Sequence, residues 1–491
     1  MNFNLLLPEI VLTLLAFVII LMGLLISNKS KNMLGYLSAA GLLASLVYVL
    51  GNGMTEKMSF FYDSLVVDPL SQVFKLIFLV VSLITVIASI EYFKNNRNQD
   101  EYYTLILLST VGMMIVASAN DLIALFVGFE LASMSTYVLA GFEKKNPASL
   151  EAALKYFIIG SISSALMLFG MSLVYGITGS TNIPAIIEFF KITHLSAESS
   201  LGILAMIFLV AGFGFKMALV PFHMWAPDTY EGSPSVVSAM LAAGSKKMGF
   251  VAAFRVLILA LVAIKVDIQL TFAILAIITM TYGNVVAISQ RSIKRMLAYS
   301  SIAQAGYISL AFVAMTQMSI AGGVLLALGH ALMKAGAFIA VAVVSYMVLN
   351  DNKNARNTDD LGNFAGLGKR APITALSLFI FFLALAGIPP SAGFIGKFVL
   401  FYSIMVEALT PATSWFLIIV IIAILNSALS IYYYARVIRY MYVLPANGER
   451  IKEPVPYVIA LLIAVIGTIG IGLYPEPFIQ MAINAAQVLG V

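Results

Sequence analysis

Two ionisable side chains lie deep inside apolar stretches of this sequence, at positions where a charge could hold or pass a proton. Glu130 lies in LIALFVGFELASMSTYVLAGF, about eight residues, or roughly 12 Å of helix, from either end of that run. Lys216 follows the uncharged run 201–214, and Pro221 then interrupts the helix. A charge in the bilayer core costs about 3 kcal/mol, so each needs a partner, a proton or water. Because opposite charges on neighbouring helices keep each other ionised, we expect Glu130 and Lys216 to form a proton-carrying pair.

Two further positions combine basic residues in patterns that suit proton transfer. Lys246 and Lys247 lie midway along an apolar stretch. Since adjacent helical residues point about 100° apart, we expect at most one of them to face the same interior line as Glu130 and Lys216, and we favour Lys246. His330 and Lys334 are spaced i, i+4, so they share one helix face, and histidine titrates near neutral pH. The alternative for His330 is a structural hydrogen bond to a backbone carbonyl.

Two other lysines are each open to two interpretations. Lys155 lies about a turn and a half into an apolar stretch, so it either carries protons or extends to the membrane surface. Lys397 follows Pro389 and Pro390, which again interrupt an apolar helix. It either holds a proton beside the opened backbone or anchors a kinked helix.

Glu9 is expected to face the dipole of the helix that it begins and to have no further role. Lys75 and Arg255 are expected to extend to the membrane surface or to be structural. His223 and Asp228 are expected to help water enter or to cap a helix.

The composition is that of a polytopic membrane protein. Of 491 residues, 61% are hydrophobic and 10% charged, and the mean hydropathy is +0.99, whereas soluble domains have about 25% charged residues. The absence of cysteine excludes disulfides, iron–sulfur clusters and thiolate zinc sites in this chain. We expect no metal site, because His194, His223 and His330 are dispersed, and no cofactor, because no glycine-rich phosphate or dinucleotide loop is present. The net charge of +5 comes from loops that flank the membrane, so we expect no nucleic-acid partner.

Apolar runs of roughly 17–25 residues predict an all-α fold with about fourteen transmembrane helices. Most loop lysines and arginines lie on one side, and only Lys57, Lys191 and Lys265 lie on the other. This asymmetry predicts a plasma-membrane protein with the first side in the cytoplasm and both termini outside. The expected spans are 5–26, 33–50, 70–92, 103–119, 122–142, 150–177, 201–225, 235–263, 268–289, 296–315, 320–348, 373–407, 415–443 and 455–474.

The seventh and twelfth of these spans are the broken ones, so each is fourth in a group of five helices. Because five is odd, the two groups cross the membrane in opposite senses. Paired broken helices in inverted repeats indicate an ion pathway. We predict a three-helix segment at 1–102, a first five-helix repeat at 103–264, a second, inverted repeat at 265–444, and a C-terminal helix and tail at 445–491.

Three motifs of the chain resemble those of one known family. The segments FVGFELASMSTYVLAGF, GFGFKMALVPFHMWAPDTYEGSPS and LALAGIPPSAGFIGKF, in this order and spacing, resemble the antiporter-like membrane subunits of respiratory complex I. The start LLLPEI, the lysine near the end of the third motif and the lack of a long C-terminal lateral helix make the chain most similar to the subunit N (subunit 2) group. The resemblance covers nearly the whole chain.

The resemblance implies roles for individual residues. Glu130 and Lys216 would be the pair of helices five and seven, Lys246 the connecting lysine of helix eight, and Lys397 the lysine near the exit. Lys155 would be a functional lysine of helix six. The His330–Lys334 pair departs from some members of the group. The expected path runs, in order, through Glu130, Lys216, Lys246, His330 with Lys334, and Lys397, with a cytoplasmic mouth near Pro221 and an outer mouth near Pro389 and Pro390.

The function that the resemblance implies is proton translocation by a membrane subunit of a respiratory NADH:quinone oxidoreductase, or of a complex with a related electron donor. Flavin, iron–sulfur clusters and a quinone or phenazine would then belong to partner subunits. The expected partners are other membrane subunits of the complex, the lipid bilayer and protons. The alternatives are a subunit of a multi-subunit sodium/proton antiporter and a subunit of a membrane-bound hydrogenase.

Overall fold

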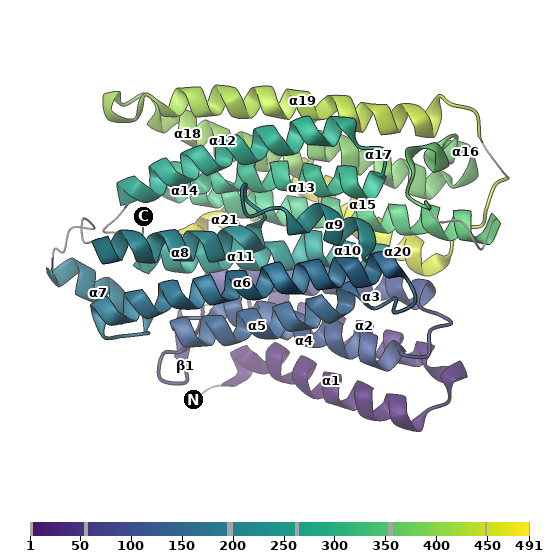
Figure 1. The fold of residues 1–491 in the computed structure, drawn as a ribbon, viewed down its shortest axis with the longest axis horizontal. Coiled ribbons are helices and arrows are strands. Elements are labelled where there is room, and N and C mark those ends of the chain that lie inside the picture. The colour runs from purple at the N-terminus through teal and green to yellow at the C-terminus, as the bar shows by residue number, and fades with distance from the viewer. Residues whose placement is uncertain are drawn as a thin grey trace.

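The computed structural model describes residues 3–53, 57–193, 200–260, 265–351, 357–446 and 449–490, which form a bundle of long helices aligned along one direction (Figure 1). Among these residues, twelve helices are long and apolar enough to cross a membrane. Two shorter apolar helices, Leu201–Met217 and Pro372–Ala386, belong to the broken spans. The predicted polytopic helical fold is therefore confirmed. His194 lies outside the described residues.

The helices follow the predicted order along the chain. The N-terminal part holds η1 (Phe3–Leu6), α1 (Leu7–Leu25), η2 (Asn28–Ser30), α2 (Asn32–Gly51), β1 (Met58–Phe60), β2 (Leu65–Val67) and α3 (Pro69–Tyr92). Next come α4 (Gln99–Ser118), α5 (Leu122–Ala140), α6 (Pro147–Thr178), α7 (Ile183–Thr193), α8 (Ser200–Met217), α9 (Trp225–Gly232), α10 (Ser235–Met240), π-helical turns at Leu241–Ser245 and Phe254–Ala260, and α11 (Lys246–Ala253) between them. The remainder holds α12 (Lys265–Ser289), α13 (Ile293–Ser309), α14 (Ala311–Ala314), α15 (Gln317–Asp351), η6 (Leu361–Phe364), α16 (Leu367–Arg370), α17 (Pro372–Ala386), α18 (Ala392–Glu407), η7 (Pro411–Thr413), α19 (Phe416–Tyr442), α20 (Val455–Leu473) and α21 (Glu476–Gln487).

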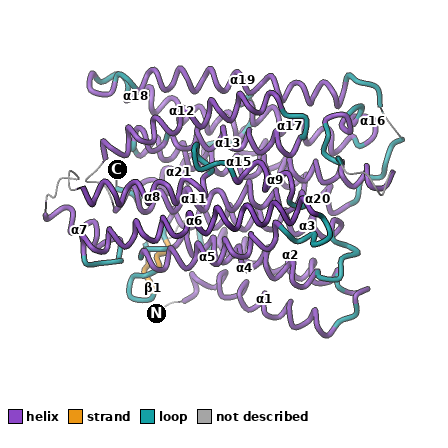
Figure 2. Tube along the Cα trace, in the orientation of Figure 1, coloured by secondary structure: helices purple, strands orange, loops and turns teal. Residues whose placement is uncertain are grey.

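Some of these elements were not predicted from the sequence. Strands β1 and β2 form a short antiparallel hairpin, in which Ser59 pairs with Val66 (Figure 2). Helices α7 and α21 are too short to span a membrane. Long apolar runs mark the membrane spans in the sequence. A strand of three residues and helices of 11 and 12 residues are too short to contain such a run.

Helix α3 is the buried centre of the N-terminal part. Asp68 and Ser71 cap its start reciprocally, each side chain accepting from the other's backbone nitrogen. Beyond this cap, α3 is buried over most of its length and packs against α2 and α4. It also packs against α15 and α20, which are distant in sequence. The N-terminal helices and the C-terminal half therefore share one core.

Corresponding helix pairs in the two predicted repeats approach each other equally closely. Gly112 of α4 faces α5, where an added Cβ would lie 2.6 Å from the backbone nitrogen of Ala132. Gly283 of α12 faces α13, where an added Cβ would lie 2.6 Å from the backbone nitrogen of Ala303. Small residues at such positions allow two helix backbones to pack closely in a membrane. Likewise, α6 packs along both halves of the broken helix in the first repeat, α8 and α9. In the second repeat, α15 packs along both halves of the other broken helix, α17 and α18.

Both broken spans open at the predicted prolines. The first break, between α8 and α9, contains the cis bond Val220–Pro221, and the second, between α17 and α18, contains the cis bond Pro389–Pro390. At the first break the Val220 nitrogen donates to Thr279 Oγ1 of α12 (3.0 Å), and the Trp225 indole donates to the Phe215 carbonyl (2.8 Å). Protein groups thus replace the lost helical hydrogen bonds, as backbone at membrane depth requires.

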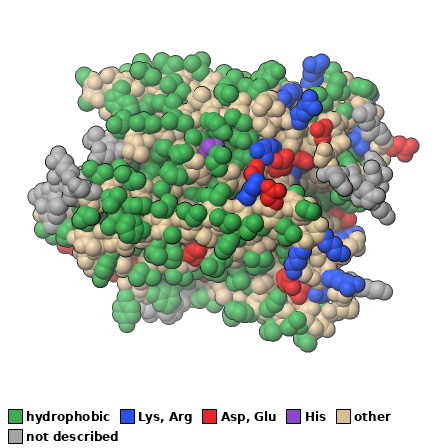
Figure 3. All heavy atoms as spheres, in the orientation of Figure 1, with side chains coloured by type: hydrophobic (Ala, Val, Ile, Leu, Met, Phe, Trp, Pro, Cys, Tyr) green, Lys and Arg blue, Asp and Glu red, His purple; other side chains and the backbone are tan. Residues whose placement is uncertain are grey.

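The two ends of the bundle differ in charge. On the face drawn in Figure 3, lysine, arginine, aspartate and glutamate side chains gather toward the end that carries α16. The two termini, α7 and β1 lie toward the opposite end (Figure 1). This is the asymmetry from which the orientation was predicted.

Candidate functional site

Glu130 and Lys216 belong to neighbouring helices of the first half, but each is bonded to hydroxyl groups. The Ser164 hydroxyl of α6 donates to Glu130 Oε1 at 2.5 Å. Lys216 Nζ, at the end of α8, donates to Ser133 Oγ of α5 (2.9 Å) and to Tyr156 OH of α6 (3.1 Å). Both residues are described in full, and no ion pair within 4.0 Å joins them. The predicted pair is therefore not a direct contact in this structure.

Aromatic rings surround the fully buried Lys216 side chain. Its Nζ lies 5.4 Å from the ring centroid of Phe129, 5.9 Å from that of Tyr137 and 5.4 Å from that of Tyr156. Tyr156 stacks in turn on Trp225, the first residue of α9, at 4.5 Å. Ring faces stabilise a cation by about 0.5–2 kcal/mol each. The surroundings of Lys216 therefore include the second half of its own broken helix.

Lys246 and Lys247 of α11 and His330 and Lys334 of α15 form a buried group, here called the basic cluster, with α13 packed against it. Lys246 Nζ donates to Ser301 of α13, at 3.1 Å to the carbonyl and 3.0 Å to the hydroxyl. Lys247 Nζ donates to the Ala242 carbonyl (3.0 Å) and is hydrogen-bonded to His330 Nδ1. All four side chains are fully buried.

Lys246 and Lys247 are both buried, and Lys247, which the sequence did not favour, is the one that contacts His330 directly. The segment Ser235–Ile258 is surrounded by protein on all sides, so side chains that point 100° apart both reach neighbouring helices. A π-helical turn at Leu241–Ser245 directly precedes the two lysines. Such turns often occur at functional sites.

The second helix of the cluster, α15, carries His330 and Lys334 one turn apart. Lys334 Nζ donates to the Leu297 carbonyl (2.9 Å) and is also hydrogen-bonded to Ser300 Oγ, both on α13. The alternative of a carbonyl contact is not observed among the described residues, since Lys247 occupies His330 Nδ1 and Nε2 has no hydrogen-bond partner. Within the cluster, Lys247 and His330 contact each other directly, whereas Lys246 and Lys334 are both bonded to α13.

Lys397 of α18 points into the second break. Its Nζ donates to the carbonyls of Leu385 (3.0 Å) and Ala386 (3.4 Å) at the end of α17, and to Ser427 Oγ of α19 (2.9 Å). It also lies 4.7 Å from the ring centroid of Tyr307. A cavity of about 450 Å³, lined mostly by apolar residues of α18 and α19, borders it. Lys397 thus lies beside opened backbone, as predicted, and it also bonds that backbone.

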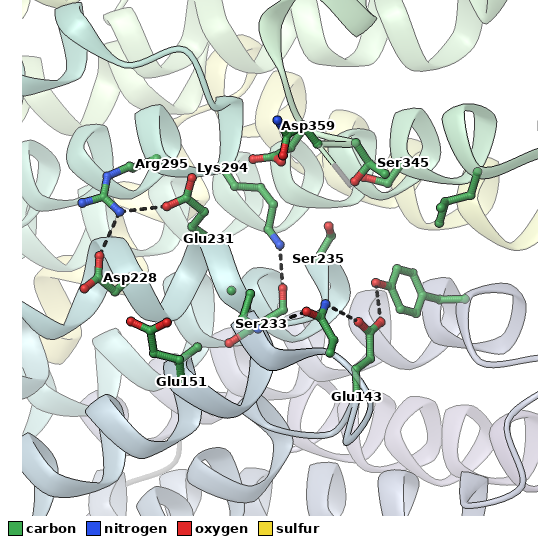
Figure 4. Close-up of a pocket in the computed structure, with 18 of the residues that line it drawn as sticks. Glu143, Glu151, Asp228, Glu231, Ser233, Ser235, Lys294, Arg295, Ser345 and Asp359 are labelled. Carbon is green, nitrogen blue, oxygen red and sulfur yellow. Dashed lines mark hydrogen bonds and ion pairs between the residues drawn. The ribbon is translucent and has the colours of Figure 1, made fainter. Parts of the chain in front are cut away.

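Lys155 lies apart from the basic cluster and lines a polar cavity of about 660 Å³ at the charged end of the bundle. Figure 4 shows this cavity. Its side chain is 43% exposed and pairs with Glu151 (2.7 Å) and Asp228 (2.8 Å). Arg295 pairs with both Asp228 and Glu231 at 2.8 Å. Partial burial alone would raise the pKa of Asp228, but the hydrogen bonds from Lys155 and Arg295 hold that pKa below its usual value. Lys155 reaches the surface, as one of its two interpretations expected.

Polar groups lie between this cavity and the basic cluster. Figure 4 shows Lys294 directed toward Ser233, whose carbonyl accepts from Lys294 Nζ at 2.6 Å. The Tyr230 hydroxyl and Ser233 Oγ are buried without a hydrogen-bond partner among the described residues. The Tyr230 ring centroid lies 5.9 Å from Lys246 Nζ. Buried hydroxyls without a protein partner are the groups that internal waters satisfy.

Three ion pairs near the ends of the helices have a different character. Arg255 forms a buried two-pronged contact with Asp68, at 2.8 and 3.1 Å, and Arg255 Nε donates to the Ala117 carbonyl. Lys75 pairs with Glu9 at 2.6 Å, so Glu9 does more than face a helix dipole. Lys31 pairs with Asp100 at 2.6 Å. These contacts join segments that are distant in sequence, which agrees with the structural alternative expected for Lys75 and Arg255.

Several contacts of the site were not predicted from the sequence. His223, in the first break, is buried, and its ring lies edge-on to Tyr282 at 4.7 Å. Lys247, Ser300 and Ser301 were not singled out as partners. The adjacent pairs KK and SS in apolar stretches are the signal that could have marked them. No group of three or more potential metal ligands occurs among the described residues.

Two broken helices, each with a buried lysine, and a basic cluster between them define an antiporter-like polytopic membrane subunit. The family model described as NADH:quinone oxidoreductase/Mrp antiporter, TM, matches residues 119–430. The chain belongs to this family.

Relatives that match nearly the whole chain support its place in this family. F(420)H(2) dehydrogenase subunit N of Methanosarcina mazei is 56% identical over 98% of each chain. NADH-quinone oxidoreductase subunit N of Trichlorobacter lovleyi is 39% identical over 99% of this chain and 98% of the relative. A chain in the structure of respiratory complex I from Thermus thermophilus is 29% identical, with a TM-score of 0.79 over 96% of this chain and 98% of that one.

Proposed function

We propose that this chain translocates protons as a membrane subunit of a respiratory oxidoreductase complex, while other subunits carry out electron transfer. The observation that carries the proposal is the basic cluster and its flanking lysines. Lys216, Lys246, Lys247, Lys334 and Lys397 are buried, and their described contacts are to hydroxyls, carbonyls, aromatic rings and one imidazole. A lysine without an acidic partner in a protein interior loses its proton more easily than a paired one.

The cavities support a path with two mouths. Protons would enter at the polar cavity near Lys294 and pass the hydroxyls of Ser233 and Tyr230 to reach Lys246. They would leave beside Lys397, whose cavity opens between α18 and α19. Electron transfer in the partner subunits would act on this path by changing the charge at Glu130, which lies on a helix next to that of Lys216. Lys155 and Asp228 would line the entrance.

The rest of the complex is also part of the proposal. The names of the full-length relatives support partner subunits of a quinone-type or F420H2-type dehydrogenase, so flavin, iron–sulfur clusters and a quinone or phenazine would lie in those partners. The orientation predicted from loop charges would place the polar cavity in the cytoplasm and both termini outside the plasma membrane.

The test is proton translocation by the purified complex in sealed vesicles, with electron transfer measured in parallel. Lys216→Met should leave the complex assembled and able to transfer electrons, but should strongly reduce the protons moved per electron. Lys144→Met is the matched control, because Lys144 is a surface lysine whose side chain is 68% exposed. Normal proton translocation by the assembled Lys216→Met complex would overturn the proposal.

A further inference from the structure

Lys247 and His330 make the one hydrogen bond among the described residues that joins two basic side chains directly. By contrast, Lys246 and Lys334 donate to serine hydroxyls and backbone carbonyls of α13. Ser300 uses its own hydroxyl proton on the Leu297 carbonyl (3.0 Å), so it cannot pass a proton while it makes that bond. Direct proton transfer between α11 and α15 is therefore available at Lys247 and His330.

The chemistry of a nitrogen–nitrogen contact limits the protons that this pair can hold. A hydrogen bond between Lys247 Nζ and His330 Nδ1 needs a lone pair on one of the two nitrogens, so one proton is shared along it. Both side chains are fully buried, and neither contacts an acidic residue among those described. Two adjacent positive charges would have nothing to compensate them in this interior.

We propose that Lys247, with His330, is the step at which a proton crosses from the first half of the chain to the second; the inference rests on the proposed function. The Lys247 ammonium gives its proton to His330 Nδ1, which leaves a neutral amine and an imidazolium. The ring then releases its other proton from Nε2, which has no partner among the described residues and is free to bond water. The neutral ring now carries its proton on Nδ1. Rotation turns this group toward water, exchange with water moves the proton to Nε2, and rotation back restores Nδ1 as the acceptor for the next proton.

This step gives Lys247 a role different from that of Lys246. Lys246 is held by two groups of Ser301 and lies below the Tyr230 ring, on the side of the entrance. Lys247 is held by the Ala242 carbonyl of the π-helical turn before it, which directs its remaining donors toward α15. The two adjacent lysines thus receive and hand on the proton in turn.

The experiment compares Lys247→Met, Lys247→Arg, His330→Gln and the Lys247→Met/His330→Gln double variant in the reconstituted complex. Arginine can still donate to Nδ1 but does not release a proton at working pH. We expect all three single variants to move protons about tenfold more slowly or worse, because a positioned proton donor contributes ~10²–10⁴ in rate. The double variant should be no slower than the slower single variant, since both changes block one step.

Several outcomes would overturn this inference. Full translocation by Lys247→Arg would show that the lysine only positions His330, and full translocation by Lys247→Met would remove its role altogether. Multiplied effects in the double variant would place the two residues in separate steps. If Lys247→Met does not assemble, Lys247→Arg and His330→Gln decide. If Lys216→Met blocks translocation while the Lys247 variants are normal, only this inference fails; if Lys216→Met is also normal, the proposed function fails.

Discussion

Replacing Lys397 separates its two proposed roles, because one side chain holds both an ionisable group and a set of anchoring contacts. In Lys397→Met the charged group and three hydrogen bonds are lost. Each hydrogen bond to a charged group contributes about 1.5–3 kcal/mol when nothing replaces it. A purely anchoring lysine would therefore be expected to hold the second break together.

The neighbours of Lys397 reduce that cost. The Leu385 carbonyl also accepts from Gln304 Nε2 (3.0 Å), and the Ala386 carbonyl also accepts from Ser427 Oγ (3.1 Å). Neither carbonyl is left unpaired after the substitution, and removing a buried charge also removes its desolvation penalty. We expect a net destabilisation of about 1–3 kcal/mol, which an assembled membrane complex should tolerate.

The assay measures protons moved per electron in sealed vesicles for Lys397→Met, Lys397→Arg and the control Gln304→Leu. Both Lys397 variants should transfer electrons but move protons about tenfold more slowly or worse, because neither side chain releases a proton. Gln304→Leu removes the other donor to the Leu385 carbonyl and no ionisable group, so its proton translocation should be close to normal. Full translocation by Lys397→Arg, or an equal loss in Gln304→Leu, would refute the reasoning and leave Lys397 as an anchor.

Three further predictions concern charge and orientation. Glu130→Gln should assemble but lose most proton translocation, and Glu130→Asp should keep part of it; normal activity of the glutamine variant would exclude a role for the charge. In this cysteine-free chain, Lys452→Cys should resist an impermeant thiol reagent in intact cells while Tyr62→Cys, at a position 97% exposed, reacts. The reverse labelling would invert the orientation. Asp68→Ala leaves Arg255 buried and unpaired and should cost about 3–5 kcal/mol, measured as a fall in the thermal midpoint of the purified complex; an unchanged midpoint would contradict this.

The helix breaks could be predicted because prolines and charges are rare in apolar helices and therefore stand out. Pro221 and Pro389–Pro390 marked the breaks, and Lys216 and Lys397 lie beside them as expected. The apolar runs also located the spans, since hydrophobic length alone determines which segments can cross a bilayer. These features depend on one stretch of sequence at a time.

Contacts between distant helices could not be predicted in this way. Ser133 and Tyr156, which bond Lys216, resemble many other hydroxyl residues of apolar helices, and only packing brings them together. Lys246 was preferred to Lys247 because adjacent helical residues point about 100° apart. That angle does not decide between them in a helix enclosed by protein on every side, where every direction is an interior one.

The partners of the buried cations divide them into two kinds. Lys31, Lys75 and Arg255 each contact a carboxylate directly and lie near helix ends. Each of these ion pairs joins two segments that are distant in sequence and holds them together. The lysines between the two breaks contact neutral groups, which accept a hydrogen bond from an ammonium but add no opposite charge. In the proposed path, the charge on each base would therefore influence the next base along the line, such as Lys247 and His330, as a stepwise transfer of protons requires.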